Sequence, residues 1–146
     1  MNDIARFERA LMTVRKELKH MSKAAVYFAQ CDRNAEVKIG FSTCVPNRLY
    51  ALSNQRWSSM TLLGWVRGGP KVEREMHARF AEFAIGHEWF LPAPELLEFA
   101  KTSIRHDEPK DITSKYGRIN DMRYDSLVRY ESHYLRRIEE AKAVAA

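Results

Sequence analysis

Apolar residues near the start of the chain recur at three- and four-residue steps. Between Asp3 and about Lys19 they alternate with charged residues, and the apolar positions are Ile4, Phe7, Leu11, Val14 and Leu18. This spacing places apolar side chains along one face of a helix. The pattern predicts a basic amphipathic helix within residues 1–23.

The pattern changes to short β-prone runs in the next part of the chain. Residues 24–30 and 35–41 are rich in β-branched and aromatic residues, with a polar link at 31–34 between them. Such a pair predicts an antiparallel hairpin. Pro46 then suits the first turn of a helix that runs to about Ser53, and the apolar run 60–66 predicts a third strand.

Two more helices are expected before a polar stretch. Pro70 opens the first, whose apolar face holds Val72, Met76, Phe80 and Phe83, and Gly86 is expected to end it as a left-handed cap. The second starts near Pro94. The fold class is therefore α+β: a small three-stranded antiparallel sheet flanked by helices, with an extra helix at each end of the chain.

The last third of the chain is polar and then helical. Residues 101–121 contain Pro109 and Gly117 and predict a linker. A stripe in residues 122–146 predicts a long terminal helix and consists of Leu127, Tyr130, Tyr134, Ile138 and Ala141. The expected organisation is an N-terminal helix in 1–23, a central domain at 24–100, the linker at 101–121 and a C-terminal helix in 122–146.

Composition narrows the class of protein. The 146 residues are 45% hydrophobic and 29% charged, which suits one folded domain with helical extensions. No apolar run approaches the roughly 20 residues of a membrane span. The two cysteines, Cys31 and Cys44, lack the spacing of a zinc site or a disulfide framework. We expect a cytoplasmic protein without a membrane partner.

The net charge of +5 is unevenly distributed along the chain. Residues 1–23 hold six Lys and Arg against three Asp and Glu, residues 24–100 hold eight against eight, and residues 101–146 hold ten against eight. Basic flanks could grip phosphates around a neutral centre, or they could be ordinary solvated helix faces. The terminal helices could bind DNA, pack as a lid or dimerise the protein, so a monomer and a homodimer both stay open.

Five short motifs in residues 24–100 occur in a recognisable order. They are Ala25-Val26-Tyr27, Lys38-Ile39-Gly40, Arg48, the run from Val72 to Phe80 that contains Glu73, and Gly86-His87-Glu88-Trp89-Phe90. Together they resemble the GIY-YIG nuclease superfamily, in particular its phage-associated T5orf172/Mug113-like branch. The asparagine that many members carry after the glutamate helix has no counterpart, and His87 and Glu88 occupy that region.

The resemblance implies a role for each matching residue. Glu73 would hold a divalent metal ion, Mg²⁺ or Mn²⁺, which prefers oxygen ligands. Tyr27 would orient or deprotonate the attacking water. Lys38 and Arg48 would supply positive charge, and Arg48 would also contact a phosphate.

Helix geometry favours Glu73 over its neighbour Glu75. Glu73 and His77 lie four residues apart on one face, beside the apolar stripe that must pack on the sheet. Glu75 falls on the far flank, where solvent is expected. His77 is therefore a candidate catalytic neighbour that could assist the metal or a phosphate.

Four residues are candidates for binding nucleic acid: Arg48, Arg56, Trp57 and Lys71. Trp57 could stack on a base, or it could fold back on the domain. The leading hypothesis is a metal-dependent DNA endonuclease. The alternatives are a catalytically inactive DNA-binding or regulatory module on the same fold, and an interaction module whose terminal helices form a coiled dimer.

Overall fold

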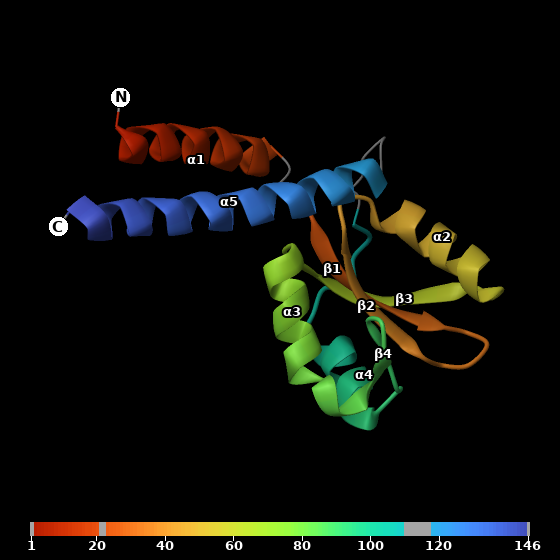
Figure 1. The fold of residues 1–146 in the computed structure, drawn as a ribbon. Helices are drawn as coiled ribbons and strands as arrows, with labels where there is room; N and C mark the ends of the chain where they lie inside the picture. Colours follow the sequence, from red (N-terminus) through yellow and green to blue (C-terminus); the bar gives the residue numbers. More distant parts are fainter. Residues whose placement is uncertain (1, 21–22, 110–117, 146) are drawn as a thin grey trace. The chain divides into compact units, whose positions relative to one another are not determined.

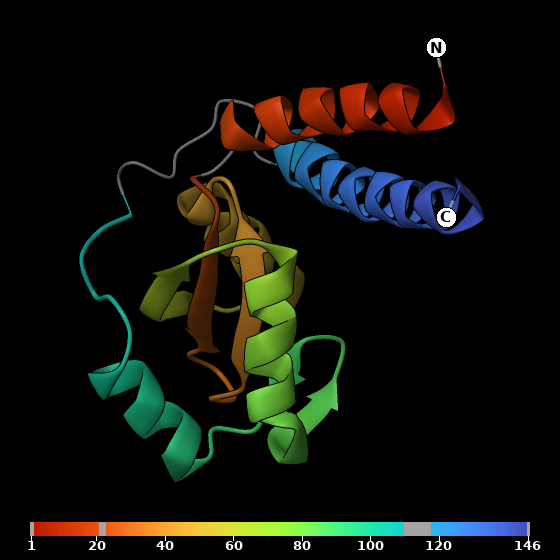
Figure 2. The same cartoon turned by 90° about the vertical axis from the view of Figure 1, so that its left-hand side faces the viewer.

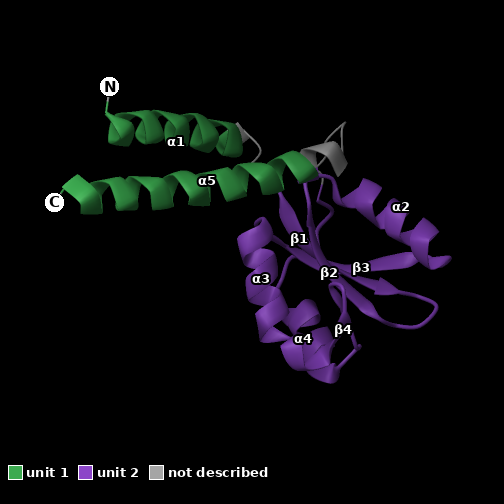
Figure 3. Cartoon of the chain, viewed as in Figure 1, with its two compact units in different colours: residues 1–22, 122–146 green, residues 23–121 purple. Residues whose placement is uncertain are grey.

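The structure is a computed structural model that describes residues 2–20, 23–109 and 118–145. The chain divides into two compact units (Figure 3): Lys23–Asp121 form one, and Met1–Ser22 with Met122–Ala146 form the other. None of the described helices combines the length and the apolar character of a membrane span. All the described strands belong to the larger unit.

The larger unit is built on an antiparallel sheet with the strand order β3-β1-β2-β5-β4 (Figure 1). The strands are β1 (Ala25–Cys31), β2 (Val37–Ser42), β3 (Met60–Arg67), β4 (Ala84–Gly86) and β5 (Trp89–Phe90). The α+β class is as predicted, but the expectation of three strands is wrong because β4 and β5 extend the sheet to five. Strands of three and two residues are too short to show an alternating pattern in the sequence.

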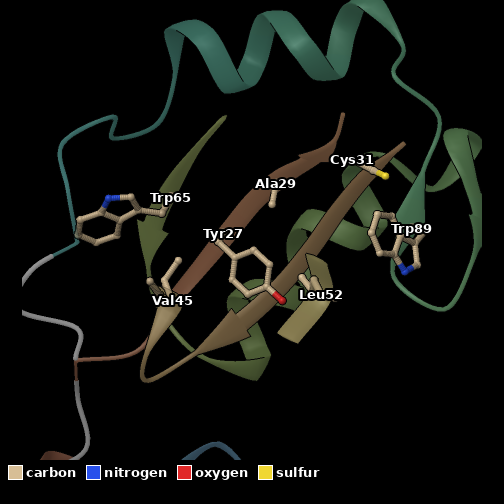
Figure 4. Packing of buried hydrophobic residues seen from close by; sticks show 8 residues of the cluster. Tyr27, Ala29, Cys31, Val45, Leu52, Trp65 and Trp89 are labelled. Carbon is tan, nitrogen blue, oxygen red and sulfur yellow. The ribbon is translucent and has the colours of Figure 1, made fainter. Parts of the chain in front are cut away.

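Helices cover both faces of this sheet. Helix α2 (Val45–Arg56) packs on one face, where Val45 and Leu52 join Tyr27 in a buried cluster (Figure 4). Helices α3 (Pro70–Arg79) and α4 (Pro94–Thr102) pack on the other face, around Phe28 (Figure 2). The two clusters follow from strand alternation, since successive side chains point to opposite faces.

The end of α3 differs from the prediction. The helix ends at Arg79, a 3₁₀ turn follows at Ala81–Phe83, and Gly86 is the last residue of β4 with a φ of 109°. The positive φ of Gly86 therefore belongs to a hairpin and not to a helix cap. The sequence signal is the same in both cases, because glycine is favoured wherever φ is positive.

Residues 105–107, which follow α4, contact the sheet. Trp65 of β3 exchanges two main-chain hydrogen bonds with Arg105, of 2.9 and 3.0 Å, and the Trp65 indole donates to the Asp107 carbonyl at 2.8 Å. The first part of the expected linker 101–121 thus belongs to the last turn of α4 and to this contact. Its residues 110–117 lie outside the described residues.

The smaller unit consists of α1 (Asp3–His20) and most of α5 (Arg118–Ala145), which lie side by side in opposite directions (Figures 1 and 2). Phe7 contacts Tyr134 with 6.4 Å between ring centroids, and Arg15 pairs with Glu131 at 3.1 Å. Leu11, Val14 and Ile138 are buried. Within the expected apolar stripe of the terminal helix, Ile138 is buried whereas Tyr130 is 53% exposed.

Candidate functional site

The edge of β2 is where the larger unit gathers polar groups. Strand β5 pairs with β2 only at Val37 and Lys38, so the edge beyond them needs other partners. Helix α3 supplies two: the Phe41 amide donates to Glu73 Oε2 at 2.8 Å, and His77 Nε2 lies 2.7 Å from the Ile39 carbonyl oxygen. The short length of β5 therefore brings α3 side chains to the edge of the sheet.

Tyr27 approaches this edge from β1. Its register partner on β2 is Gly40, and a Cβ at Gly40 would stand only 2.7 Å from the tyrosine hydroxyl oxygen. Only glycine lets the phenol lie across the strand at this point. The Gly of the Lys38-Ile39-Gly40 motif is thus explained by the tyrosine of the first motif.

The Tyr27 hydroxyl is buried without a hydrogen-bond partner among the described residues, and the side chain is 0% exposed. Burial raises the pKa of Tyr27 far above its usual range, and the nearby carboxylates of Glu88 and Glu73 raise it further. Arg48 of α2, half-buried beside the hydroxyl, acts in the opposite direction and lowers this pKa. The phenol is therefore neutral in this structure and keeps a proton to donate.

Lys38 is a buried cation on the same face of the sheet as Tyr27. Only 7% of the residue is exposed. Its ammonium lies 2.8 Å from Glu88 Oε2, 3.4 Å from the His87 carbonyl oxygen and 5.6 Å from the centre of the Trp89 ring. A buried charge needs such partners, and the hairpin of β4 and β5 provides them.

Neighbouring groups shift the pKa of Glu73 in opposite directions. Burial and the neighbouring Glu88 carboxyl raise the pKa of Glu73 to about 7, although the Phe41 amide and Lys38 favour its charged form. Two carboxyl groups in one partly buried site cannot both ionise easily. The site can therefore exchange a proton near neutral pH.

The structure brings four of the predicted catalytic residues to one region: Tyr27, Lys38, Arg48 and Glu73. His77 reaches the same edge, but its Nε2 is engaged with the Ile39 carbonyl and its ring contacts Phe90 at 5.3 Å between centroids. These contacts hold α3 against β2. A catalytic role for His77 stays a prediction.

The predicted nucleic-acid residues are more dispersed. Arg56 is committed to packing, with its guanidinium 3.7 Å from the centre of the Trp89 ring and 3.5 Å from Glu36. Trp57 is 87% exposed, which leaves its ring open to solvent. Lys71 is exposed in the first turn of α3, two residues before Glu73.

Glu88 is a site residue that sequence reasoning did not select. Its carboxylate contacts Lys38 and affects both Glu73 and Tyr27. The signal was the absence of the asparagine that the resemblance leads one to expect, in a region where His87 and Glu88 stand instead.

The candidate site thus consists of a tyrosine, two cations and a glutamate that lie around one strand of an α+β domain. The chain belongs to the T5orf172 domain family, whose profile matches residues 24–105. This domain is associated with GIY-YIG-like endonucleases. Comparison with curated proteins and with solved structures gives no match.

Proposed function

We propose that this chain is a metal-dependent endonuclease that hydrolyses phosphodiester bonds in DNA. The proposal rests on one observation: four side chains lie close together around β2, namely Tyr27, Lys38, Arg48 and Glu73. Phosphodiester hydrolysis needs an oriented water, positive charge near the phosphate and a carboxylate for a metal ion. These residue types supply each requirement.

The donor set fits Mg²⁺ or Mn²⁺. The described residues contain no group of three or more His, Cys, Asp or Glu side chains that could enclose a metal ion. Mg²⁺ does not require one, because it is commonly held by one or two carboxylates and keeps several waters. Glu73 would hold the ion, and a bound divalent ion would supply Lewis-acid charge to the scissile phosphate.

Three side chains would act on water and phosphate. Because burial keeps the Tyr27 phenol neutral, its hydroxyl would orient the attacking water by a hydrogen bond. Arg48 would contact a phosphate oxygen with its planar fork of donors. Lys38, fixed by Glu88, would add a second positive charge.

One observation favours the alternative of a DNA-binding module without turnover. The Tyr27 side chain is 0% exposed, so water and substrate must gain access to its hydroxyl before it can act. A binding module would not need that access. It would bind DNA with a steep salt dependence, because phosphate contacts release counterions.

A cleavage assay distinguishes the two functions. The wild-type chain is incubated with supercoiled plasmid and with single-stranded DNA in Mg²⁺ or Mn²⁺, with and without EDTA. We expect cleavage that EDTA stops and that Glu73→Gln lowers about 10²-fold or more. The glutamine keeps an oxygen for the Phe41 amide, so the fold should persist.

Glu75→Gln is the matched control, because Glu75 lies on the exposed flank of the same helix. It should cut DNA at the wild-type rate. Cleavage that survives both EDTA and Glu73→Gln would contradict the proposal. Salt-sensitive DNA binding without cleavage in any metal would establish the alternative.

A further inference from the structure

The hairpin between β4 and β5 has an unusual pair of turn residues. His87 and Glu88 form its two-residue loop, with φ values of 47° and 69°. Two positive φ values in a row are typical of a type I′ turn, where Asn-Gly is strongly favoured. Non-glycine residues in this conformation cost stability and are concentrated at functional sites.

The turn fixes the position of the Glu88 carboxylate. The Ile39 amide donates to the Glu88 carbonyl at 3.0 Å, which anchors the backbone to β2. The side chain then places Oε2 at 2.8 Å from the Lys38 ammonium, and the Glu88 carboxyl is close enough to Glu73 to raise its pKa. Glu73 is itself anchored through Oε2 to the Phe41 amide.

Two carboxyl groups held by separate elements bring several oxygen ligands to one place. Lys38 supplies one positive charge for the pair. A hard divalent cation prefers such oxygen ligands, and Mg²⁺ is commonly bound by two carboxylates.

The Tyr27 hydroxyl is an independent sign of an additional ligand. It is completely buried and forms no hydrogen bond within the described chain, although Arg48 lies beside it, and both carboxylates are close enough to raise its pKa. Buried polar atoms without partners are rare in folded proteins. A water carried by a bound ion would provide the missing partner.

We infer that Glu88 is a second carboxylate ligand of the divalent metal site, in addition to Glu73, and that the strained His87-Glu88 turn presents it. The inference rests on the proposed function for the presence of a metal ion. The metal ion would then have one ligand from the hairpin and one from α3. No local sequence motif joins these two elements.

The test is a titration with Mn²⁺, followed by electron paramagnetic resonance of the free ion, with and without a phosphorothioate DNA duplex. Glu88→Gln should weaken Mn²⁺ binding about 10-fold or more, as should Glu73→Gln, while the exposed control Glu75→Gln should bind like wild type. Unchanged affinity in Glu88→Gln would overturn the inference.

A double-mutant cycle separates a ligand from a mere partner of Lys38. If Glu88 only neutralised Lys38, the double variant Lys38→Met/Glu88→Gln would recover the affinity of Lys38→Met. If Glu88 is a ligand, the double variant should stay about 10-fold or more weaker than Lys38→Met. Recovery would overturn the inference.

The double variant His87→Asn/Glu88→Gly guards against loss of folding. It installs the favoured type I′ pair, so thermal unfolding should occur at an equal or higher temperature while Mn²⁺ binding is lost. Full Mn²⁺ binding in this variant would overturn the inference.

The two proposals fail differently. Binding of Mn²⁺ that depends on Glu88, without any DNA cleavage, would support the inference and refute the nuclease. Cleavage that depends on Glu73 with Mn²⁺ binding indifferent to Glu88 would do the reverse. A wild-type chain that binds no Mn²⁺ even with DNA present would refute both.

Discussion

Tyr27 and Phe28 are neighbours in the sequence and both are 0% exposed, yet they belong to different environments. Phe28 points into the face covered by α3 and α4, where it meets Phe80 edge-on with ring centroids 6.2 Å apart. Tyr27 points into the face covered by α2, where its hydroxyl finds no partner among the described residues. One face of the sheet is fully satisfied, and the other carries unsatisfied polar chemistry.

The contrast extends to the residues around each side chain. The Phe28 cluster is apolar throughout and contains Val26, Val37, Ile39, Phe80, Phe90, Leu96 and Ala100. The Tyr27 side of β2 instead holds the buried ammonium of Lys38 and a single glycine that leaves room for the phenol. Both faces bury apolar side chains, but only the second also holds groups that can react, so we expect the first face to contribute more to stability.

The largest effect should follow from damage to the apolar face. Phe28→Ala removes a buried ring that contacts Phe80 and Phe99, and it should lower the free energy of unfolding by about 3–5 kcal/mol. Phe28→Leu, which keeps most of the volume, should cost clearly less. Urea denaturation followed by circular dichroism measures both. A loss below about 1 kcal/mol for Phe28→Ala would show that this face does not dominate stability.

A smaller effect, of opposite sign, is expected one residue earlier. Tyr27→Phe removes a buried hydroxyl that has no partner, so the variant should be as stable as wild type or gain about 1 kcal/mol. Its cleavage rate should nevertheless fall about 10²-fold, because the group proposed to orient water is gone. Gain in stability with loss of rate would be the signature of a functional face.

Tyr50→Phe is the control for this pair, since Tyr50 lies on α2 and is 71% exposed. Neither its stability nor its cleavage rate should change. Destabilisation of Tyr27→Phe by more than about 1 kcal/mol would mean that the hydroxyl has a partner after all.

The regular elements were predictable because their signals are local. The apolar stripe of α3 and the β-prone runs of β1 and β2 are visible within a few residues of sequence. Strands β4 and β5 were not, because three- and two-residue strands exist only through pairing with β2 and with each other. The same pairing decides that Gly86 ends a strand and not a helix.

Some residues of the candidate site could also be predicted from the sequence. Tyr27, Lys38, Arg48 and Glu73 follow from the resemblance, and the structure gathers them, while their catalytic roles stay predictions. The neighbours of Glu73 could not be read from the sequence. Glu88 reaches it through a turn with two positive φ values, and the His77 partner is a main-chain carbonyl left free by the shortness of β5.

The smallest expected effect concerns Glu73. This residue lies on α3, a helix of the apolar face, but its carboxyl group belongs to the polar site. Its pKa is raised from an ordinary 4.5 to about 7, so between these values the folded chain holds a proton that the unfolded chain releases. Stability contributed by that proton is present below about pH 4.5 and is lost as the pH rises through about 7. Because the side chain is only partly buried, the loss should be less than about 1 kcal/mol. Thermal unfolding in EDTA from pH 5 to 8 should therefore show wild type and Glu75→Gln losing slightly more stability with rising pH than Glu73→Gln does. If wild type and Glu73→Gln instead changed in parallel over this range, Glu73 would be an ordinary ionised glutamate with the same pKa in the folded and unfolded chain.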